Sequence, residues 1–125
     1  MRRRISRRED YLKLIHILSR YGEVRGSDLA DELGIKRPTV CVYLKRLAEN
    51  GDIIMDEHHC VLLTPQGLAV AESTLDKHGL LLRLFQDLGV PHNVALIDAC
   101  AIEHNISPET CAALKQLLEE RRASL

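Results

Sequence analysis

Three side chains near residue 100 combine the chemical types and the spacing of a metal site. Cys100, Glu103 and His104 stand three and four residues apart along the chain. On an α-helix, positions with this separation share one face. A thiolate, a carboxylate and an imidazole would then point the same way, and all three are ligands for transition metals. The spacing also fits a surface Glu–His pair beside a small core cysteine.

A second pattern, in residues 28–40, is typical of a helix-turn-helix. Ala30 lets two helices approach, Gly34 makes the turn, and Val40 packs the second helix on the first. An ordinary helical hairpin in a core is the alternative. In DNA-binding motifs the second helix enters the major groove by its N-terminal part. The residues predicted to contact DNA are Arg7, Arg8, Lys36, Arg37, Pro38, Thr39, Val42, Tyr43, Lys45 and Arg46.

The net charge of −1 hides an asymmetry between the two halves of the chain. Residues 1–50 hold 12 Lys and Arg against 7 Asp and Glu, whereas residues 51–125 hold 5 against 11. A basic half that contains the helix-turn-helix favours phosphate binding. An acidic half favours cations. Solvated helix faces of either sign are the alternative explanation.

The hydrophobic periodicity predicts a fold that is mainly α with a small β-hairpin wing. Gly22, Gly34 and Gly89 end predicted helices, and Pro38 and Pro108 stand where first turns favour proline. The short runs at 53–55 and 60–63 are β-type, which predicts a winged helix-turn-helix. The predicted helices cover residues 6–21, 26–33, 37–50, 64–88 and 91–105, with a last helix starting at 108.

The composition argues against membrane and secreted classes. No apolar run is long enough to span a bilayer, and the basic start lacks the apolar stretch of a secretory signal. We therefore expect a cytoplasmic protein with no membrane partner. The four cysteines at 41, 60, 100 and 111 are scattered among elements typical of an intracellular protein, so reduced thiols are expected.

The order of several short motifs along the chain resembles the diphtheria toxin repressor family, which includes the manganese transport regulators. The resemblance covers about residues 6–120 and implies a homodimer that binds a palindromic operator in double-stranded DNA. It implies a winged helix-turn-helix domain over residues 1–72 and an all-helical metal-binding and dimerisation domain over 73–125. The motifs that carry it are Glu9–Leu12, Arg37–Val40, Leu63–Gly67, Lys77-His78 and Cys100–Ser107.

The resemblance also implies a ligand set for Fe(II) or Mn(II). The family's primary metal site maps onto Asp10, Cys100, Glu103 and His104. Family iron sensors carry Met where Asp10 stands, and many manganese sensors carry Glu where Cys100 stands. This chain is a hybrid, because its thiolate favours a softer metal and its first-helix carboxylate a harder one.

Two departures from the family pattern predict one ion per protomer. Lys13 stands where two-metal manganese sensors have a second acid, and an ammonium beside an ion is unfavourable. His78 corresponds to a ligand of the iron sensors' second site, but Leu82 and Leu96 replace its polar companions. We therefore expect His78 to be an optional ligand.

These features predict a repressor that senses Fe(II) or Mn(II) and switches off metal-uptake genes. The chain has no Gly-rich phosphate loop, and Cys100 with His104 on one helix would leave no pocket for a thiol enzyme. The alternative function is a winged-helix regulator that responds to thiol oxidation or to an organic effector.

Overall fold

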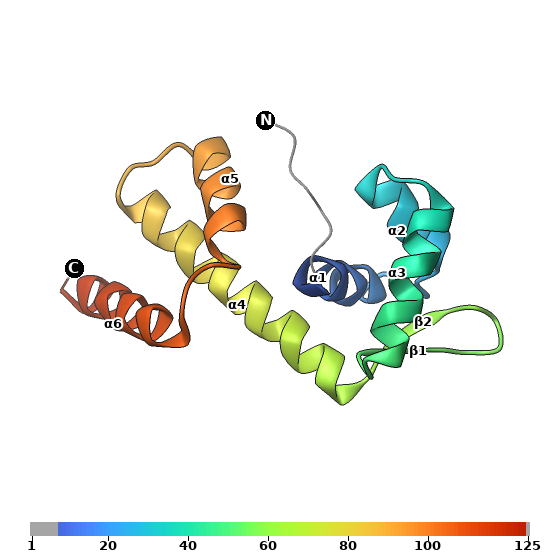
Figure 1. The fold of residues 1–125 in the computed structure, drawn as a ribbon. Coiled ribbons are helices and arrows are strands. Elements are labelled where there is room, and N and C mark those ends of the chain that lie inside the picture. The colour runs from blue at the N-terminus through green and yellow to red at the C-terminus, as the bar shows by residue number, and fades with distance from the viewer. Residues whose placement is uncertain (1–7, 125) are drawn as a thin grey trace. The chain divides into compact units, whose positions relative to one another are not determined.

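A computed structural model describes residues 8–124, which form six helices and one antiparallel hairpin (Figure 1). Chain contacts group into two units, Met1–Glu72 and Ser73–Leu125, with the boundary inside α4. The predicted fold class, mainly α with a small hairpin wing, is confirmed. The elements are α1 (Arg8–Ser19), α2 (Gly26–Leu33), α3 (Arg37–Glu49), β1 (Ile53–Met55), β2 (Val61–Leu63), α4 (Pro65–Asp87), α5 (His92–Ile102) and α6 (Pro108–Ala123).

The N-terminal unit is built around the helix-turn-helix of α2 and α3. Gly34 adopts a left-handed conformation with φ 66°, and its N–H donates to the carbonyl of Ala30. A β-carbon is disfavoured in that conformation, so glycine suits the turn. The buried side of α3 carries Val40, Leu44 and Leu47, which join α1 and the hairpin in one aliphatic core.

The wing is the hairpin of β1 and β2, in which Ile54 pairs with Leu62. Its turn is held by the carboxylate of Asp56, which accepts the backbone N–H groups of His58 (2.8 Å) and Cys60 (2.9 Å). Cys60 is 2% exposed. It is not part of β2, but it forms an isolated β-bridge with Arg25. This inward cysteine is part of the core of the N-terminal unit.

A buried carboxylate ties the start of α1 to the junction between α3, β1 and α4. The Asp52 side chain is fully buried and accepts two hydrogen bonds from the guanidinium of Arg8, at 2.6 and 2.7 Å. Asn50 and Gln66 donate to the same carboxylate. The hydrogen bonds from Arg8 are the main cause that lowers the pKa of Asp52 to about 2.

The Arg8–Asp52 pair predicts a loss of stability in acid. Because the folded-state pKa of Asp52 lies below 3.8, its stabilising contribution is complete above that value and is lost as the pH falls towards 2. The Arg8 side chain is 39% exposed, so solvent reduces the contribution to about 1–2 kcal/mol. Urea unfolding of Arg8→Met should show a smaller loss between pH 4 and pH 2 than wild type does.

Arg20→Met, which removes an exposed arginine from the end of the same helical region, is the matched control. It should keep the wild-type dependence of unfolding free energy on pH. Equal acid sensitivity in Arg8→Met and wild type would contradict the role given to the pair.

The C-terminal unit packs the second half of α4 with α5 and α6. Residues buried in it include Leu81, Leu84, Ala95, Ala99 and Leu118. None of the helices in residues 8–124 combines the length and the apolar character needed to cross a bilayer.

The helix predicted over residues 91–105 is shorter than expected, because α5 ends at Ile102. Asn105 turns back on the last turn, donating its backbone N–H to Ile102 and its side-chain amide to Ala101. Ser107 caps α6 by accepting the N–H of Thr110 at 3.1 Å, and its backbone is extended ahead of Pro108. A residue before proline is disfavoured in a helix, so the chain must leave α5 before this point.

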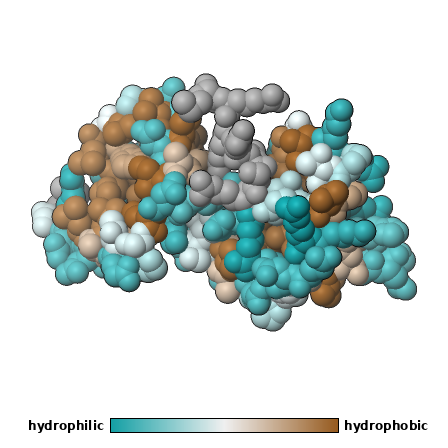
Figure 2. Space-filling model, viewed as in Figure 1, coloured by the Kyte–Doolittle hydropathy of each residue, from teal (hydrophilic) through white to brown (hydrophobic). Residues whose placement is uncertain are grey.

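Apolar side chains remain exposed on the C-terminal unit. Figure 2 shows apolar residues gathered over the part of the molecule that α4, α5 and α6 form. Exposed aliphatic groups of this kind mark surfaces that bind other molecules. The exposed large apolar residues there are Leu88, Val94, Ile97, Ile102 and Leu117.

Candidate metal centre and nucleic-acid interface

Three potential ligands meet inside the C-terminal unit. His78 comes from the middle of α4, Cys100 from the last turn of α5, and Glu103 from the residue that follows α5. Nδ1 of His78 lies 2.9 Å from Oε2 of Glu103 and 3.8 Å from Sγ of Cys100. One ligand atom from each of the three lies within 4.8 Å of the others. A single ion could therefore bind all three.

The carboxylate of Glu103 is completely buried, and each of its two oxygens lies beside an imidazole. His78 contacts Oε2, and Nε2 of His104 lies 3.5 Å from Oε1. A buried carboxylate is costly unless positive charge or hydrogen bonds compensate it. Imidazole, carboxylate and thiolate together form a donor set suited to a divalent first-row transition metal. The residues present therefore fit a cation that the family would imply.

Four of the five predicted ligands lie in the C-terminal unit, and one lies in the N-terminal unit. Glu103 lies near both Cys100 and His104, although Glu103 and His104 follow α5 instead of lying within it. His78 lies in one cluster with Cys100 and Glu103. No periodicity could reveal this, because His78 is 22 residues from Cys100 along the chain. Asp10 lies in the other unit, 5% exposed in the first turn of α1.

The outward side of α3 carries most of the predicted DNA contacts. Seven predicted residues are exposed, from the N-cap Lys36 to Arg46 near the end of the helix, whereas Val40, Leu44 and Leu47 face the core. Their exposure agrees with the prediction, and their contacts with DNA remain a prediction. The exposed residues are Lys36, Arg37, Pro38, Thr39, Val42, Lys45 and Arg46.

Tyr43, another of the predicted DNA contacts, is less exposed than these seven residues. Its ring stacks on Tyr11 of α1, with centroids 4.2 Å apart and planes 6° from parallel, so the side chain is half-buried. Burial raises the pKa of both phenols. The stack joins the recognition helix to α1, which is a structural role.

The two predicted N-terminal contacts have different outcomes. Arg7 lies outside the described residues. Arg8 is described, and its guanidinium binds Asp52 through two hydrogen bonds. These bonds use two of the five N–H donors of the guanidinium, and a contact of Arg8 with DNA remains a prediction.

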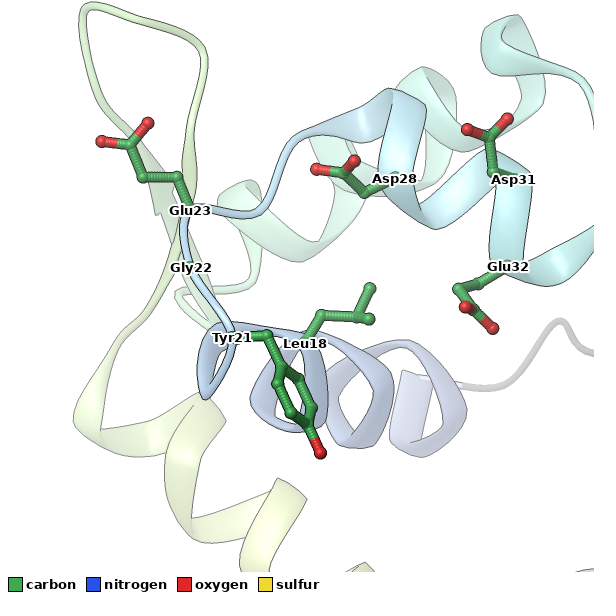
Figure 3. Close-up of a pocket in the computed structure, with 7 residues that line it drawn as sticks. All are labelled: Leu18, Tyr21, Gly22, Glu23, Asp28, Asp31 and Glu32. Atoms are coloured by element: carbon green, nitrogen blue, oxygen red, sulfur yellow. The ribbon is translucent and has the colours of Figure 1, made fainter.

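A pocket in the N-terminal unit is lined mainly by acids (Figure 3). One carboxylate has a structural task, because Asp28 accepts the backbone N–H of Arg25 at 2.9 Å. Four carboxylates line this hollow, and their negative charge disfavours contact with phosphate. The lining residues are Leu18, Tyr21, Gly22, Glu23, Asp28, Asp31 and Glu32.

Comparison with known proteins finds a family model for each of the two parts of the chain. The family model "Iron dependent repressor, N-terminal DNA binding domain" matches residues 5–59, and "Iron dependent repressor, metal binding and dimerisation domain" matches residues 64–124. The "Transcriptional regulator MntR" of Salmonella typhimurium is 36% identical over 117 residues, which are 93% of this chain and 74% of that protein. The chain belongs to the iron-dependent repressor family.

Solved structures of related repressors share the fold. The structure of the manganese regulator SloR has a TM-score of 0.80 and 27% identity, covering 93% of this chain. A manganese-dependent transcriptional repressor in complex with manganese has a TM-score of 0.79 and 28% identity, covering 90% of this chain. This chain spans 55% and 53% of those two chains, about half of their length.

Membership confirms the resemblance to the diphtheria toxin repressor family and its manganese regulators. It identifies the winged helix-turn-helix as the DNA-binding domain of a metal-dependent transcriptional repressor, and the helical unit as the metal-binding and dimerisation domain. The family assignment also explains why a metal-type donor cluster and a recognition helix occur in one short chain.

Proposed function

We propose that this repressor binds one Fe(II) or Mn(II) ion per protomer and then binds operator DNA to switch off metal-uptake genes. The observation that carries the proposal is the cluster of half-buried His78 and Cys100 with buried Glu103, in a chain whose other unit exposes a recognition helix. The place of action would be the cytoplasm, where such DNA lies. The role is regulatory and not catalytic.

The proposed ligands are His78, Cys100, Glu103, His104 and Asp10. One ligand atom from each of the first three lies within 4.8 Å of the others, and His104 contacts the carboxylate of Glu103. The family correspondence supports Asp10. A related repressor was solved in complex with manganese, which supports a divalent cation here. The thiolate of Cys100 favours Fe(II) over Mn(II), because soft ligands prefer later first-row metals.

One ion per protomer follows from Lys13. Its ammonium stands one turn after Asp10 on α1, at the position where a second acid would be needed for a second ion. A positive side chain disfavours a further cation nearby. Calorimetric titration that gave two tight ions per protomer would refute this stoichiometry.

The cation, when bound, supplies positive charge that carboxylates and the thiolate can share. Glu103 and Cys100 would bind the cation from the helical unit, and Asp10 would contribute a carboxylate from the first turn of α1. Fixing both units through shared ligands would favour the arrangement that binds DNA, and binding of this kind shifts a population that already exists.

A homodimer on palindromic DNA completes the proposal. The exposed apolar side chains of the C-terminal unit, Ile97 above all at 69% exposure, would be covered by a second copy. Two recognition helices in a dimer can then enter successive major grooves of a two-fold symmetric operator.

The proposal is tested by DNA binding with and without metal. Fluorescence anisotropy should show that Mn(II) or Fe(II) raises the affinity of the anaerobically purified protein for duplex DNA, chosen by selection from a random library, by about 100-fold. Equal affinity in metal and in chelator would refute metal sensing. A thiol-oxidation response that persisted in chelator would instead support the alternative, a redox-responsive regulator.

A further inference from the structure

The recognition helix presents an unusual outward surface at its centre. With about 100° between successive residues, Val42 lies on the side of α3 opposite to the buried Val40 and Leu44. Pro38 lies one turn earlier on the same side, and both are exposed. The middle of the outward face is therefore apolar.

Most hydrogen-bonding groups flank this centre, and Thr39 adds an exposed hydroxyl three residues before Val42. Lys36 and Arg37 stand at the start of α3, and Lys45 and Arg46 stand one turn after Val42. Cys41, the exposed neighbour of Val42, offers only a weak donor. Base recognition by paired hydrogen bonds needs side chains such as Asn, Gln or Arg, so the central position cannot use it.

The exposure of Val42 also requires an explanation. Its side chain is 57% exposed, whereas the β-branched residues Val40 and Val24 of the same unit are fully buried. Valine is a poor helix former, and a surface position gives it no packing to offset this. A surface that is covered when DNA binds would give those methyl groups a partner.

We propose that Val42 is a specificity-determining residue that reads the 5-methyl group of a pyrimidine in the major groove. In ordinary DNA the base read is thymine, whose methyl group is the apolar mark of that groove. The charged residues on either side of Val42 would fix the helix on phosphates while the apolar centre selects the base. This inference rests on the proposed DNA-binding function.

The expected effect is small for each half-site and is confined to one base. Removing one methyl group from an apolar contact should reduce affinity about fourfold, or about 15-fold when both half-sites of a dimer are changed. Contacts to phosphate are independent of base sequence, so their contribution should not change.

The test uses a duplex selected from a random library by the wild-type protein with Mn(II). Each thymine is replaced in turn by deoxyuridine, which removes only the methyl group. Wild type should lose about fourfold in affinity at one position per half-site. At that position cytosine should bind weakly, and 5-methylcytosine should recover about fourfold.

Val42→Ala isolates the contact. This variant should bind the thymine and deoxyuridine duplexes equally at the sensitive position, while responses at all other positions stay as in wild type. Ile54→Ala is the matched control, since Ile54 is an aliphatic residue of the same unit with 56% exposure. It should keep the full wild-type pattern.

Two outcomes would overturn the inference. One is a deoxyuridine profile of Val42→Ala identical to that of wild type, and the other is a wild-type profile with no sensitive thymine. If the wild-type protein selected no duplex with or without metal, the proposed function itself would fail and this inference with it. A sensitive thymine that depends on Val42 would support both.

Discussion

Gly67→Ala should destabilise the N-terminal unit by about 3 kcal/mol or more. A β-carbon at this position would overlap the carbonyl oxygen of Asp52 and lie 3.0 Å from its carbonyl carbon. That oxygen also accepts the N–H of Thr64 at 3.0 Å. Because the obstacle is backbone, α4 must move away from Asp52, which breaks the contacts that hold its start. The urea midpoint should fall by about 2 M.

Gly79→Ala is the control within the same helix. Gly79 is exposed in the interior of α4, and a β-carbon at this position would have no neighbour within 4 Å. Alanine should raise stability at this site by about 0.5–1 kcal/mol, because glycine is a poor helix former. Similar urea midpoints for Gly67→Ala and wild type would contradict the close packing at Asp52.

Local signals of the sequence predicted the elements well. Gly34 ends α2 and Pro108 stands at the start of α6, as the sequence predicted, and both effects occur within a few residues. Such features depend on neighbouring backbone atoms and hardly on the rest of the fold. The hairpin followed in the same way from two short β-type runs.

Features that depend on distant partners were harder to predict. Tyr43 has the helical position of an exposed residue, yet Tyr11 covers its ring. Arg8 resembles a phosphate contact in sequence, yet it compensates a buried aspartate 44 residues away. His78 joined the metal cluster because α4 packs beside α5, and spacing along the chain contains no information about that packing.

Asp10→Ala should separate metal binding from DNA binding. His78, Cys100 and Glu103 lie together in the C-terminal unit and do not depend on Asp10 for their ligand atoms. The variant should therefore still bind the ion, with weaker affinity because one ligand is lost. Without the carboxylate on α1, the ion could no longer favour the DNA-binding arrangement, and the metal-dependent rise in DNA affinity should fall from about 100-fold to about twofold or less.

Asp31→Ala is the matched control, because it removes an exposed carboxylate from the same unit. Each variant loses one negative charge, so a general electrostatic effect on phosphate binding would occur in both. Asp31→Ala should keep the metal response of wild type. Thermal unfolding of each variant, measured without metal, verifies that Asp10→Ala remains folded.

The decisive measurement is the ratio of operator affinities with Mn(II) or Fe(II) and with chelator, for wild type and Asp10→Ala side by side, with ion binding followed by calorimetry. The account predicts a ratio of about 100 for wild type and near one for Asp10→Ala, while both proteins bind the ion. A ratio that survives in Asp10→Ala at full size would contradict the claim that one cation links the first helix to the helical unit.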